Sequence, residues 1–264
     1  MLGLGSSLAT SGGVQGLIPS EISNLDLWLQ VNTGIVAESG NTSADGNMAD
    51  GEDINTWADQ SGNGRHAVET DGAATEKPHW ETDAAECGGL KWPDDVADTH
   101  MNLTSGKDVK ILANTDFTIM MRVKLVSFST ANALLGVGAQ DIVKWTTNKR
   151  VAILIGGSGA TDFEEASDTI ATDTYYIHTL TRTDGSTGNL TFHVHGGDYT
   201  DKFWNDDSST RRDTNEFDIG NIGCGGNGIL PVEGVIKDVL IWKGTALNDS
   251  QRAAMYAYVL GQEY

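Results

Sequence analysis

Alternating apolar and polar residues predict a chain built mostly of β-strands. Between Phe117 and Phe128, every second residue from Ile119 to Leu125 is apolar, while Arg122 and Lys124 fall between them. A period of two is typical of a strand with one face toward a core. Similar short segments are predicted as strands over residues 25–30, 78–80, 89–92, 100–103, 134–138, 142–145, 151–155, 175–182, 190–195 and 234–242. Many strands separated by turn residues predict an all-β domain.

The end of the chain combines a long strand with a helix. In the strand over 234–242, alternation places four residues on one face: Val235, Lys237, Val239 and Ile241. A helix is predicted over Asp249–Leu260, because Asn248 is a favourable N-cap and Gln251 stands at the third helical position, as in a capping box. Gly261 then ends the helix. Its apolar stripe predicts that the helix covers an edge of the sheets, through Ala253, Tyr256, Ala257 and Leu260.

The stretch Thr56–Ala67 predicts a sharp corner around which the domain is organised. Trp57 is a large apolar anchor, and residues 59–64 (DQSGNG) follow it directly. The two glycines permit positive φ, and the Asp, Ser and Asn side chains can bond to nearby backbone amides. We expect Trp57 to lie in the core, together with Trp28 and Trp242.

Two pairs of stretches resemble a known family. LDLWLQ (25–30) precedes TWADQSGNGRHAV (56–68), and FDIGNIG (217–223) precedes GVIKDVLIWKGTALNDSQRAAMYAYVLGQEY (234–264). In this order they resemble the two ends of laminin-G-like, concanavalin A-like lectin and glucanase domains. The resemblance implies an all-β, concanavalin A-like jelly-roll β-sandwich with one short C-terminal helix over residues 21–264, after a flexible N-terminal arm over residues 1–20. Because one such fold hosts many activities, it does not imply a function.

Length and charge restrict the partners. A chain of 264 residues suits a single β-sandwich domain. A net charge of −20 and a pI near 4.4 argue against nucleic-acid and anionic-membrane binding, which need clusters of basic residues. The first residues lack a basic segment before their apolar ones, so no signal peptide is expected. Cys87 and Cys224 do not make a disulfide framework, and reduced thiols fit assembly in a cytoplasm.

One trace of a catalytic motif lies at Glu216-Phe-Asp-Ile-Gly-Asn221. Glucanases of the resembled fold carry Glu-x-Asp-x-x-Glu on one strand, and retaining hydrolysis requires two carboxyl groups. Glu216 and Asp218 match the first two positions, but Asn221 stands where the resemblance places the acid/base. An amide cannot donate that proton, so we predict no catalytic residues and no enzyme activity.

No metal site or cofactor is predicted. His193 and His195 fall on one face of a strand, as a metal-binding pair would, but no third ligand can be named. Acidic pairs at residues 164–165 and 206–207 lie in predicted loops and would suit calcium, as in some laminin-G-like domains. Neither pair has the spacing of a dedicated calcium loop, and solvated acidic side chains explain both.

Five aromatic residues near strand ends or in loops are candidates for ligand binding. They are Trp80, Trp92, Trp145, Tyr199 and Trp204. Aromatic faces stack on sugars, so exposed rings would mark a contact with a glycan or a protein. The alternative is that these rings fill the open ends of the sandwich.

The N-terminal arm carries a second resemblance. MLGLGSSLATSGG followed by this domain resembles virion proteins of marine bacteriophages, including cyanophages. The resemblance implies a non-enzymatic structural component of a virion, such as a capsid decoration, neck, tail or fibre protein, assembled in the host cytoplasm. Its partners would be other virion proteins or further copies of the chain. The apolar residues of the arm are candidates for attachment to a neighbouring subunit: Leu2, Leu4, Leu8, Val14 and Leu17. The alternative function is that of a carbohydrate-binding lectin module.

Overall fold

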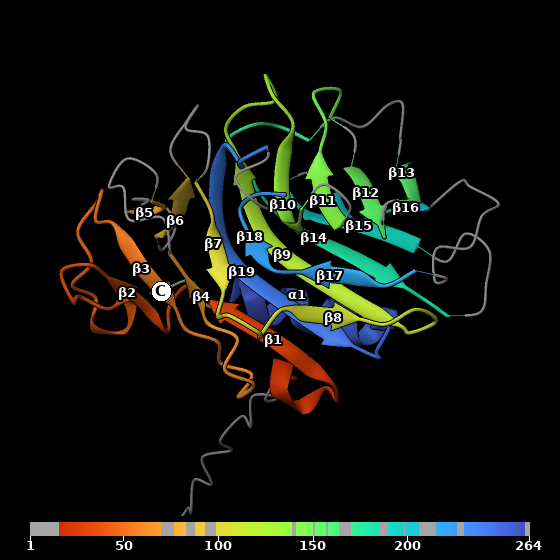
Figure 1. Cartoon of the computed structure of the whole chain (residues 1–264), viewed down its shortest axis with the longest axis horizontal. Helices are drawn as coiled ribbons and strands as arrows, with labels where there is room; N and C mark the ends of the chain where they lie inside the picture. Colours follow the sequence, from red (N-terminus) through yellow and green to blue (C-terminus); the bar gives the residue numbers. More distant parts are fainter. Residues whose placement is uncertain are drawn as a thin grey trace, which may run out of the picture.

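The computed structural model forms a β-sandwich of two antiparallel sheets with one α-helix on its surface (Figure 1). It describes residues 16–69, 77–82, 88–92, 99–138, 141–149, 151–156, 158–163, 170–184, 190–197, 199–205, 215–225 and 230–261. The predicted all-β fold with a C-terminal helix is confirmed. None of the described helices has the length and hydropathy that a transmembrane span requires.

The first sheet, which we call the helix-covered sheet, has the strand order β16-β15-β14-β9-β19-β6-β5, and β1 also pairs with β19. Its strands are β1 (Leu25–Gln30), β5 (His79–Glu81), β6 (Gly89–Trp92), β9 (Phe117–Leu125), β14 (Tyr175–Arg182), β15 (Leu190–Gly196), β16 (Tyr199–Asn205) and β19 (Gly234–Lys243).

The second sheet has the order β13-β12-β11-β10-β18-β7-β4-β3-β2. Its strands are β2 (Ile35–Ala37), β3 (Ile54–Trp57), β4 (Ala67–Val68), β7 (Met101–Leu103), β10 (Asn132–Val137), β11 (Asp141–Trp145), β12 (Val151–Ile155), β13 (Ser158–Phe163) and β18 (Asn221–Ile222). β8 (Val109–Ile111) and β17 (Phe217–Ile219) form a separate two-stranded sheet. Two short 3-10 helices, Pro19–Glu21 and Ser43–Asp45, complete the described elements.

Strand β9 lies at the centre of the helix-covered sheet and is buried on both faces. The predicted alternation is confirmed, because every second residue from Ile119 to Leu125 belongs to the main core between the two sheets. On the opposite face, Met120 joins a second apolar cluster under the helix. Both faces of the sheet are therefore covered, which explains why nine consecutive residues of β9 are buried.

The helix, α1 (Asp249–Leu260), begins and ends where the sequence predicts. Asn248 and Gln251 form the expected capping box, with reciprocal backbone-to-side-chain hydrogen bonds of 3.0 and 3.1 Å. Of the predicted stripe, only Tyr256 is confirmed: the buried helix residues are Arg252, Met255, Tyr256 and Val259. Ala253, Ala257 and Leu260 are exposed, because an ion pair draws Arg252 inward and the larger Met255 and Val259 side chains fill the space over the sheet. The helix also covers a face of the sheet, not an edge.

Strand β19 contains a β-bulge that the alternation pattern did not reveal. The register shifts between Ile236 and Asp238, so one extra residue enters the strand. Val239 and Ile241 lie in the main core together with Ile236. Val235 and Lys237 do not lie on the same face as Val239 and Ile241, so that prediction is wrong. The extra residue at the bulge turns the side chains that precede it to the opposite face.

The corner at Trp57 is built as predicted. Trp57 is fully buried, and its indole Nε1 donates a hydrogen bond of 3.0 Å to the carbonyl oxygen of Gln30. Asp59 then accepts hydrogen bonds from the backbone amides of Trp28, Ser61 and Arg65, at 3.0, 2.9 and 3.0 Å. These bonds fasten the turn to β1. Of the other two predicted core tryptophans, Trp242 is fully buried under α1, whereas Trp28 is only partly buried there.

Candidate functional site

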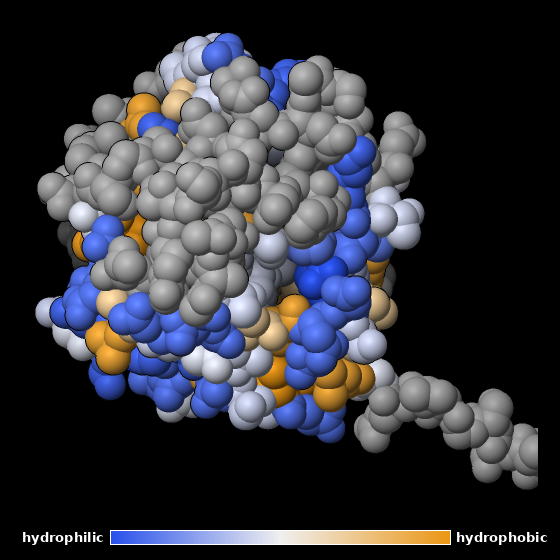
Figure 2. Space-filling view, turned by 90° about the vertical axis from the view of Figure 1, so that its right-hand side faces the viewer, coloured by the Kyte–Doolittle hydropathy of each residue, from blue (hydrophilic) through white to orange (hydrophobic). Residues whose placement is uncertain are grey.

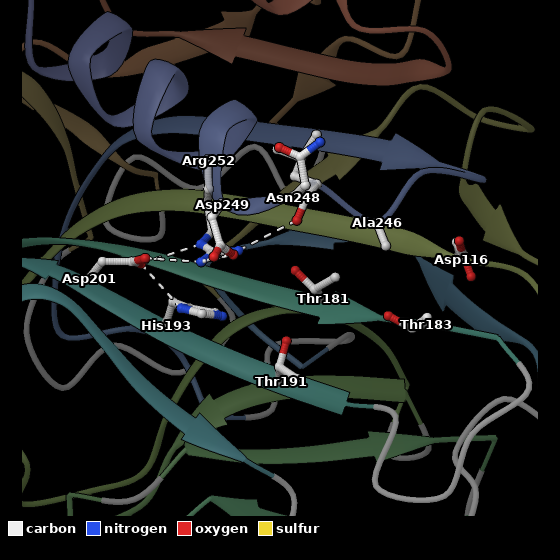
Figure 3. A pocket seen from close by; sticks show the side chains of 11 residues that line it. Asp116, Thr181, Thr183, Thr191, His193, Asp201, Ala246, Asn248, Asp249 and Arg252 are labelled. Atoms are coloured by element: carbon white, nitrogen blue, oxygen red, sulfur yellow. Dashed lines mark hydrogen bonds and ion pairs between the residues drawn. The ribbon is translucent and has the colours of Figure 1, made fainter.

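A hollow of about 740 Å³ opens on the helix side of the helix-covered sheet, beside the first turn of α1 (Figure 3). β14, β15 and β16 form its floor, and the segment that leads into α1 forms one wall. Its lining residues are Asp116, Thr181, Thr183, Thr191, His193, Asp201, Ala246, Leu247, Asn248, Asp249 and Arg252. A volume of this size is within the range of small-molecule sites.

Asp201 organises one end of the hollow. Its carboxylate accepts hydrogen bonds from Arg252 Nη2 at 2.9 Å and from the Tyr256 hydroxyl at 2.8 Å, and it lies 3.2 Å from Nδ1 of His193. Arg252 also donates to Asp249, at 3.1 Å. The network joins β15, β16 and α1, so it fixes the first turns of the helix against the sheet.

The backbone of β16 is shaped to place this carboxylate. Asp201 has a φ of +52°, in the left-handed region, which Asp tolerates better than most residues. The β15–β16 pairing also contains a register shift between Val194 and Gly196. A strand that departs from regular geometry at a polar cluster is typical of a site that re-aims a side chain.

Burial and hydrogen bonds shift the pKa values of several groups in this network. Burial opposes ionisation of Asp201, but hydrogen bonds from Arg252 and Tyr256 outweigh it and lower the pKa of the carboxyl group. Burial, and then the charge of Arg252, lower the pKa of His193, so its imidazole is neutral at pH 7. The pKa of Tyr256 is raised, chiefly by burial. At neutral pH the network therefore consists of a guanidinium, carboxylates, a neutral imidazole and a neutral phenol.

The middle of the hollow presents hydroxyl groups. Thr181 on β14 lies directly opposite Thr191 on β15 in the strand register, so both side chains share the face toward α1 (Figure 3). Thr181 is 5% exposed, and its Oγ1 has no hydrogen-bond partner among the residues that the structure describes. A buried hydroxyl without a partner is unusual in proteins. Because this oxygen itself has almost no exposed surface, a ligand in the hollow would reach it only after the side chain turns to another rotamer.

The far end of the hollow carries Asp116 and Thr183 (Figure 3). A carboxylate oxygen of Asp116 accepts a hydrogen bond of 2.6 Å from the backbone amide of Asp184. Asp116 is therefore held in place, at the opposite end of the hollow from Asp201. Between them, Ala246 is partly exposed, whereas Leu247 is buried in the apolar cluster under α1.

Three of the five predicted aromatic binding residues lie in the main core and not in this hollow. Trp80, Trp92 and Trp145 are 8%, 0% and 3% exposed and belong to the main core. Their rings offer no open face to a sugar, so the prediction that these three bind a ligand is corrected: they fill the sandwich, as the alternative interpretation held. The side chains of Tyr199 and Trp204 lie outside the described residues.

The two strand histidines lie in different surroundings. His193 contacts Asp201, whereas His195 stacks on Tyr256 with ring centroids 4.5 Å apart. Within the described ranges, no group of three or more His, Cys, Asp or Glu side chains is arranged to hold a metal ion. The acidic pairs at 164–165 and 206–207 lie outside those ranges, as does Cys87, while Cys224 is buried.

The residues of the glucanase-like motif lie in different surroundings: Glu216 precedes β17, Asp218 lies on β17 and Asn221 lies on β18. Glu216 is exposed beside β17, and Asp218 lies on β17 opposite Lys110 of β8. Burial raises the pKa of Asp218. Asn221 is 6% exposed, and its Nδ2 donates a hydrogen bond of 3.3 Å to the carbonyl oxygen of Gly136. Its amide is thus part of the second sheet's packing and lies apart from the hollow.

Of the predicted arm residues, the structure describes Leu17 and leaves Leu2, Leu4, Leu8 and Val14 outside its ranges. Leu17 is partly buried against the apolar cluster under α1, while the neighbouring Ile18 is 40% exposed. Figure 2, which faces the right-hand side of Figure 1, shows a described surface that is mainly hydrophilic, with smaller apolar areas at the left and at the lower right.

The residues of the hollow were not identified from the sequence as a site. Asp201, Arg252 and Thr181 carry no motif, and Asp201 and Arg252 are 51 positions apart. His193 alone was noted, for a metal pair that the structure does not assemble. One signal was available: Arg252 interrupts the apolar side of an otherwise amphipathic helix, which indicates a buried partner.

Comparisons with known proteins give the fold but no family. No family model and no curated protein matches the chain. Among solved structures, it is similar to Trypanosoma rangeli sialidase, with 17% identity over 91% of this chain and 33% of that one, at a TM-score of 0.52. The binding domain of botulinum neurotoxin serotype G has 13% identity over 90% of this chain and 52% of that one, at 0.51.

A third similar structure is domain 4 of AbnA, a GH43 extracellular arabinanase from Geobacillus stearothermophilus, in complex with arabinotriose. It has 14% identity over 86% of this chain and 96% of that domain, at a TM-score of 0.50. The chain spans about a third of the sialidase and about half of the toxin domain. At these identities the similarity shows a shared β-sandwich fold and nothing further.

Proposed function

We propose that this chain is a non-catalytic carbohydrate-binding module whose ligand occupies the hollow beside α1. The observation that carries the proposal is the buried, unpartnered hydroxyl of Thr181 in the middle of a hollow lined by polar side chains. Sugars present several hydroxyl groups, each of which donates and accepts, and they suit such a lining better than an apolar ligand does.

The arrangement supports binding because its polar groups are held in place before a ligand arrives. Asp201 and Arg252 hold each other, and Asp116 is held by the amide of Asp184. Polar groups that are already ordered lose little conformational entropy when a ligand binds. The partly exposed side chain of Ala246 adds a small apolar surface.

Binding without hydrolysis is supported by Asn221, which stands at the acid/base position of the resembled glucanases and is packed into the second sheet. We expect purified protein to release no reducing ends from β-glucans. Hydrolysis that Glu216→Gln abolishes would contradict this part of the proposal.

A glycan array followed by calorimetry tests binding. The full chain is applied to an array of bacterial, algal and plant-type glycans, and the strongest ligand is then titrated against the wild type and Thr181→Val. Thr56→Val, on β3 of the second sheet, is the matched control. We expect wild type and control to bind alike and Thr181→Val to bind at least tenfold more weakly. Equal affinity in all three proteins would place the site elsewhere, and no binding to any glycan would overturn the proposal.

A structural role in a bacteriophage virion is the second candidate, and the sequence MLGLGSSLATSGG before a lectin-like domain favours it. In this role the chain would decorate a capsid or belong to a neck, tail or fibre, and residues 1–20 would attach it to other virion proteins. Deletion of residues 1–16 should leave folding and sugar binding intact while abolishing incorporation into particles. Full incorporation of the truncated chain would refute the attachment role of the arm.

A further inference from the structure

We infer that the hollow beside α1 discriminates sugars by charge: it favours amine-bearing over neutral sugars and rejects acidic ones. The inference rests on the proposed function and adds the chemical class of the ligand. It comes from the charges on the described lining and from the hydrogen bonds that already occupy the guanidinium of Arg252.

Carboxylates outnumber cations around the hollow. Among the lining residues described, Asp116, Asp201 and Asp249 are acidic, whereas Arg252 is the one Lys or Arg. His193 does not add a positive charge at pH 7, because burial and the nearby Arg252 lower its pKa. A ligand in the hollow therefore meets an excess of negative charge, and the net charge of −20 over the whole chain adds to it.

Arg252 does not offer its charge to a ligand. Its side chain is 5% exposed and donates to both oxygens of Asp201, to Asp249 and, at 3.5 Å, to the carbonyl oxygen of Leu247. An arginine that recognises an acidic sugar would direct two parallel N–H groups at the ligand's carboxylate. Here the corresponding fork is already occupied by Asp201.

The beginning of α1 is also a poor site for an anion, because the Gln251 amide is capped and an exposed carboxylate, Asp249, stands there. Helix N-termini attract anions through free backbone amides, but the Asn248 side chain accepts from the amide of Gln251, and the backbone oxygen of Asn248 accepts from the amide of Arg252. Asp249 stands at the first helical position with its side chain 96% exposed. An anionic ligand would meet this carboxylate first.

The polar groups that remain are suited to hydroxyl and ammonium groups. The hydroxyl groups of Thr181, Thr183 and Thr191 can donate or accept, and the carboxylates of Asp116 and Asp249 only accept. An ammonium group donates three hydrogen bonds and carries the complementary charge. A sugar amine near either carboxylate gains an attraction that a hydroxyl or an N-acetyl group lacks.

Matched sugar triplets test this order. Wild-type protein is titrated with glycosides of glucose, glucosamine and glucuronic acid, and with the corresponding galactose series, at low and high salt. We expect the amine to bind at least threefold more tightly than the neutral sugar, and the acid at least tenfold more weakly. Both differences should shrink at high salt because screening weakens exposed charge interactions.

The double variant Asp116→Asn/Asp249→Asn locates the effect. Asparagine keeps an acceptor oxygen at both positions, so we expect the fold and the binding of neutral sugars to persist. The ratio of the affinities for the amine and the acid, which we call the affinity gap, should fall at least threefold. Asp53→Asn, next to β3 in the second sheet, is the matched control and should leave the affinity gap unchanged.

The outcomes separate this inference from the proposed function. If the acidic sugar binds as tightly as the neutral or amine sugar, or more tightly, the charge inference alone is overturned. An affinity gap that the double variant leaves unchanged overturns it as well. Binding to no member of either series, nor to any glycan on the array, overturns both.

Discussion

Two aspartates organise two distant parts of this molecule, and they do so with different partners. Asp59 holds the turn after Trp57 through three backbone amides and the Ser61 hydroxyl. Asp201 holds the wall of the hollow through side chains only: Arg252, Tyr256 and His193. Backbone donors cannot change with substitution, whereas side-chain donors can be replaced, titrated or displaced. The first arrangement builds a rigid corner, and the second builds a site.

The corner should dominate the stability of the domain. Trp57→Ala removes a fully buried indole from the main core, and we expect it to lower the free energy of unfolding by ~3–5 kcal/mol. Urea denaturation measures this change. A midpoint that stays within error of the wild type would mean that Trp57 does not anchor the fold.

In urea denaturation, replacing Asp59 should lower the free energy of unfolding more than replacing Asp201 does. Asp59→Ala leaves the backbone amides of Trp28, Ser61 and Arg65 without their acceptor, and we expect the free energy of unfolding to fall by about 3 kcal/mol. Asp201→Ala removes a carboxylate whose side chain is 32% exposed and whose partners can turn toward water. Its expected loss is about 1–2 kcal/mol. A larger loss for Asp201 would show that the hollow, and not the corner, is the structural centre.

A third buried group, His178 on β14, should give the domain its acid sensitivity. Its ring lies between Trp145, Phe192 and Tyr176, with centroids 5.3, 5.7 and 6.3 Å away. Neither ring nitrogen has a hydrogen-bond partner among the described residues. Burial lowers the pKa of His178 to about 3.

The sign of the pH effect follows from this lowered pKa. Below pH 6.5 the unfolded chain binds a proton that the folded state rejects, so stability falls as the pH falls and the loss is complete near pH 3. Between pH 6.5 and pH 5 the loss from this group is ~2 kcal/mol. His178→Leu should flatten the curve of unfolding free energy against pH in this window. Lowered pKa values at His79, His193 and His195 should leave a smaller slope of the same sign.

The smallest stability effect is expected in the hollow itself. Thr181→Val removes a hydroxyl that makes no hydrogen bond within the described protein, so the free energy of unfolding should change by less than ~1 kcal/mol. Calorimetric unfolding checks this. A loss of several kcal/mol would mean that the hydroxyl has a structural partner, and the proposal for the hollow would lose its main support.

Sequence reasoning succeeded where the determining contacts are local. The alternation in β9, the capping box of α1 and the turn at Asp59 are each encoded within a few residues, and the structure has all three. It failed at the bulge after Ile236, where one extra residue changes the period of two. It also failed for the buried side of the helix, where Arg252 turns inward to pair with the distant Asp201. The hollow combines strands and a helix from separate parts of the chain, so a local pattern could indicate a buried partner for Arg252 but not the hollow itself.

The most direct test of the site is a comparison of amide chemical shifts with and without the sugar selected on the array. If the hollow binds the ligand, shifts should change along residues 181–183, 191–193 and 246–252, while residues 59–65 of the corner stay unchanged. Perturbations that cluster at the corner or on the second sheet, with none around Thr181 and Asp249, would contradict the assignment of this hollow as the carbohydrate site.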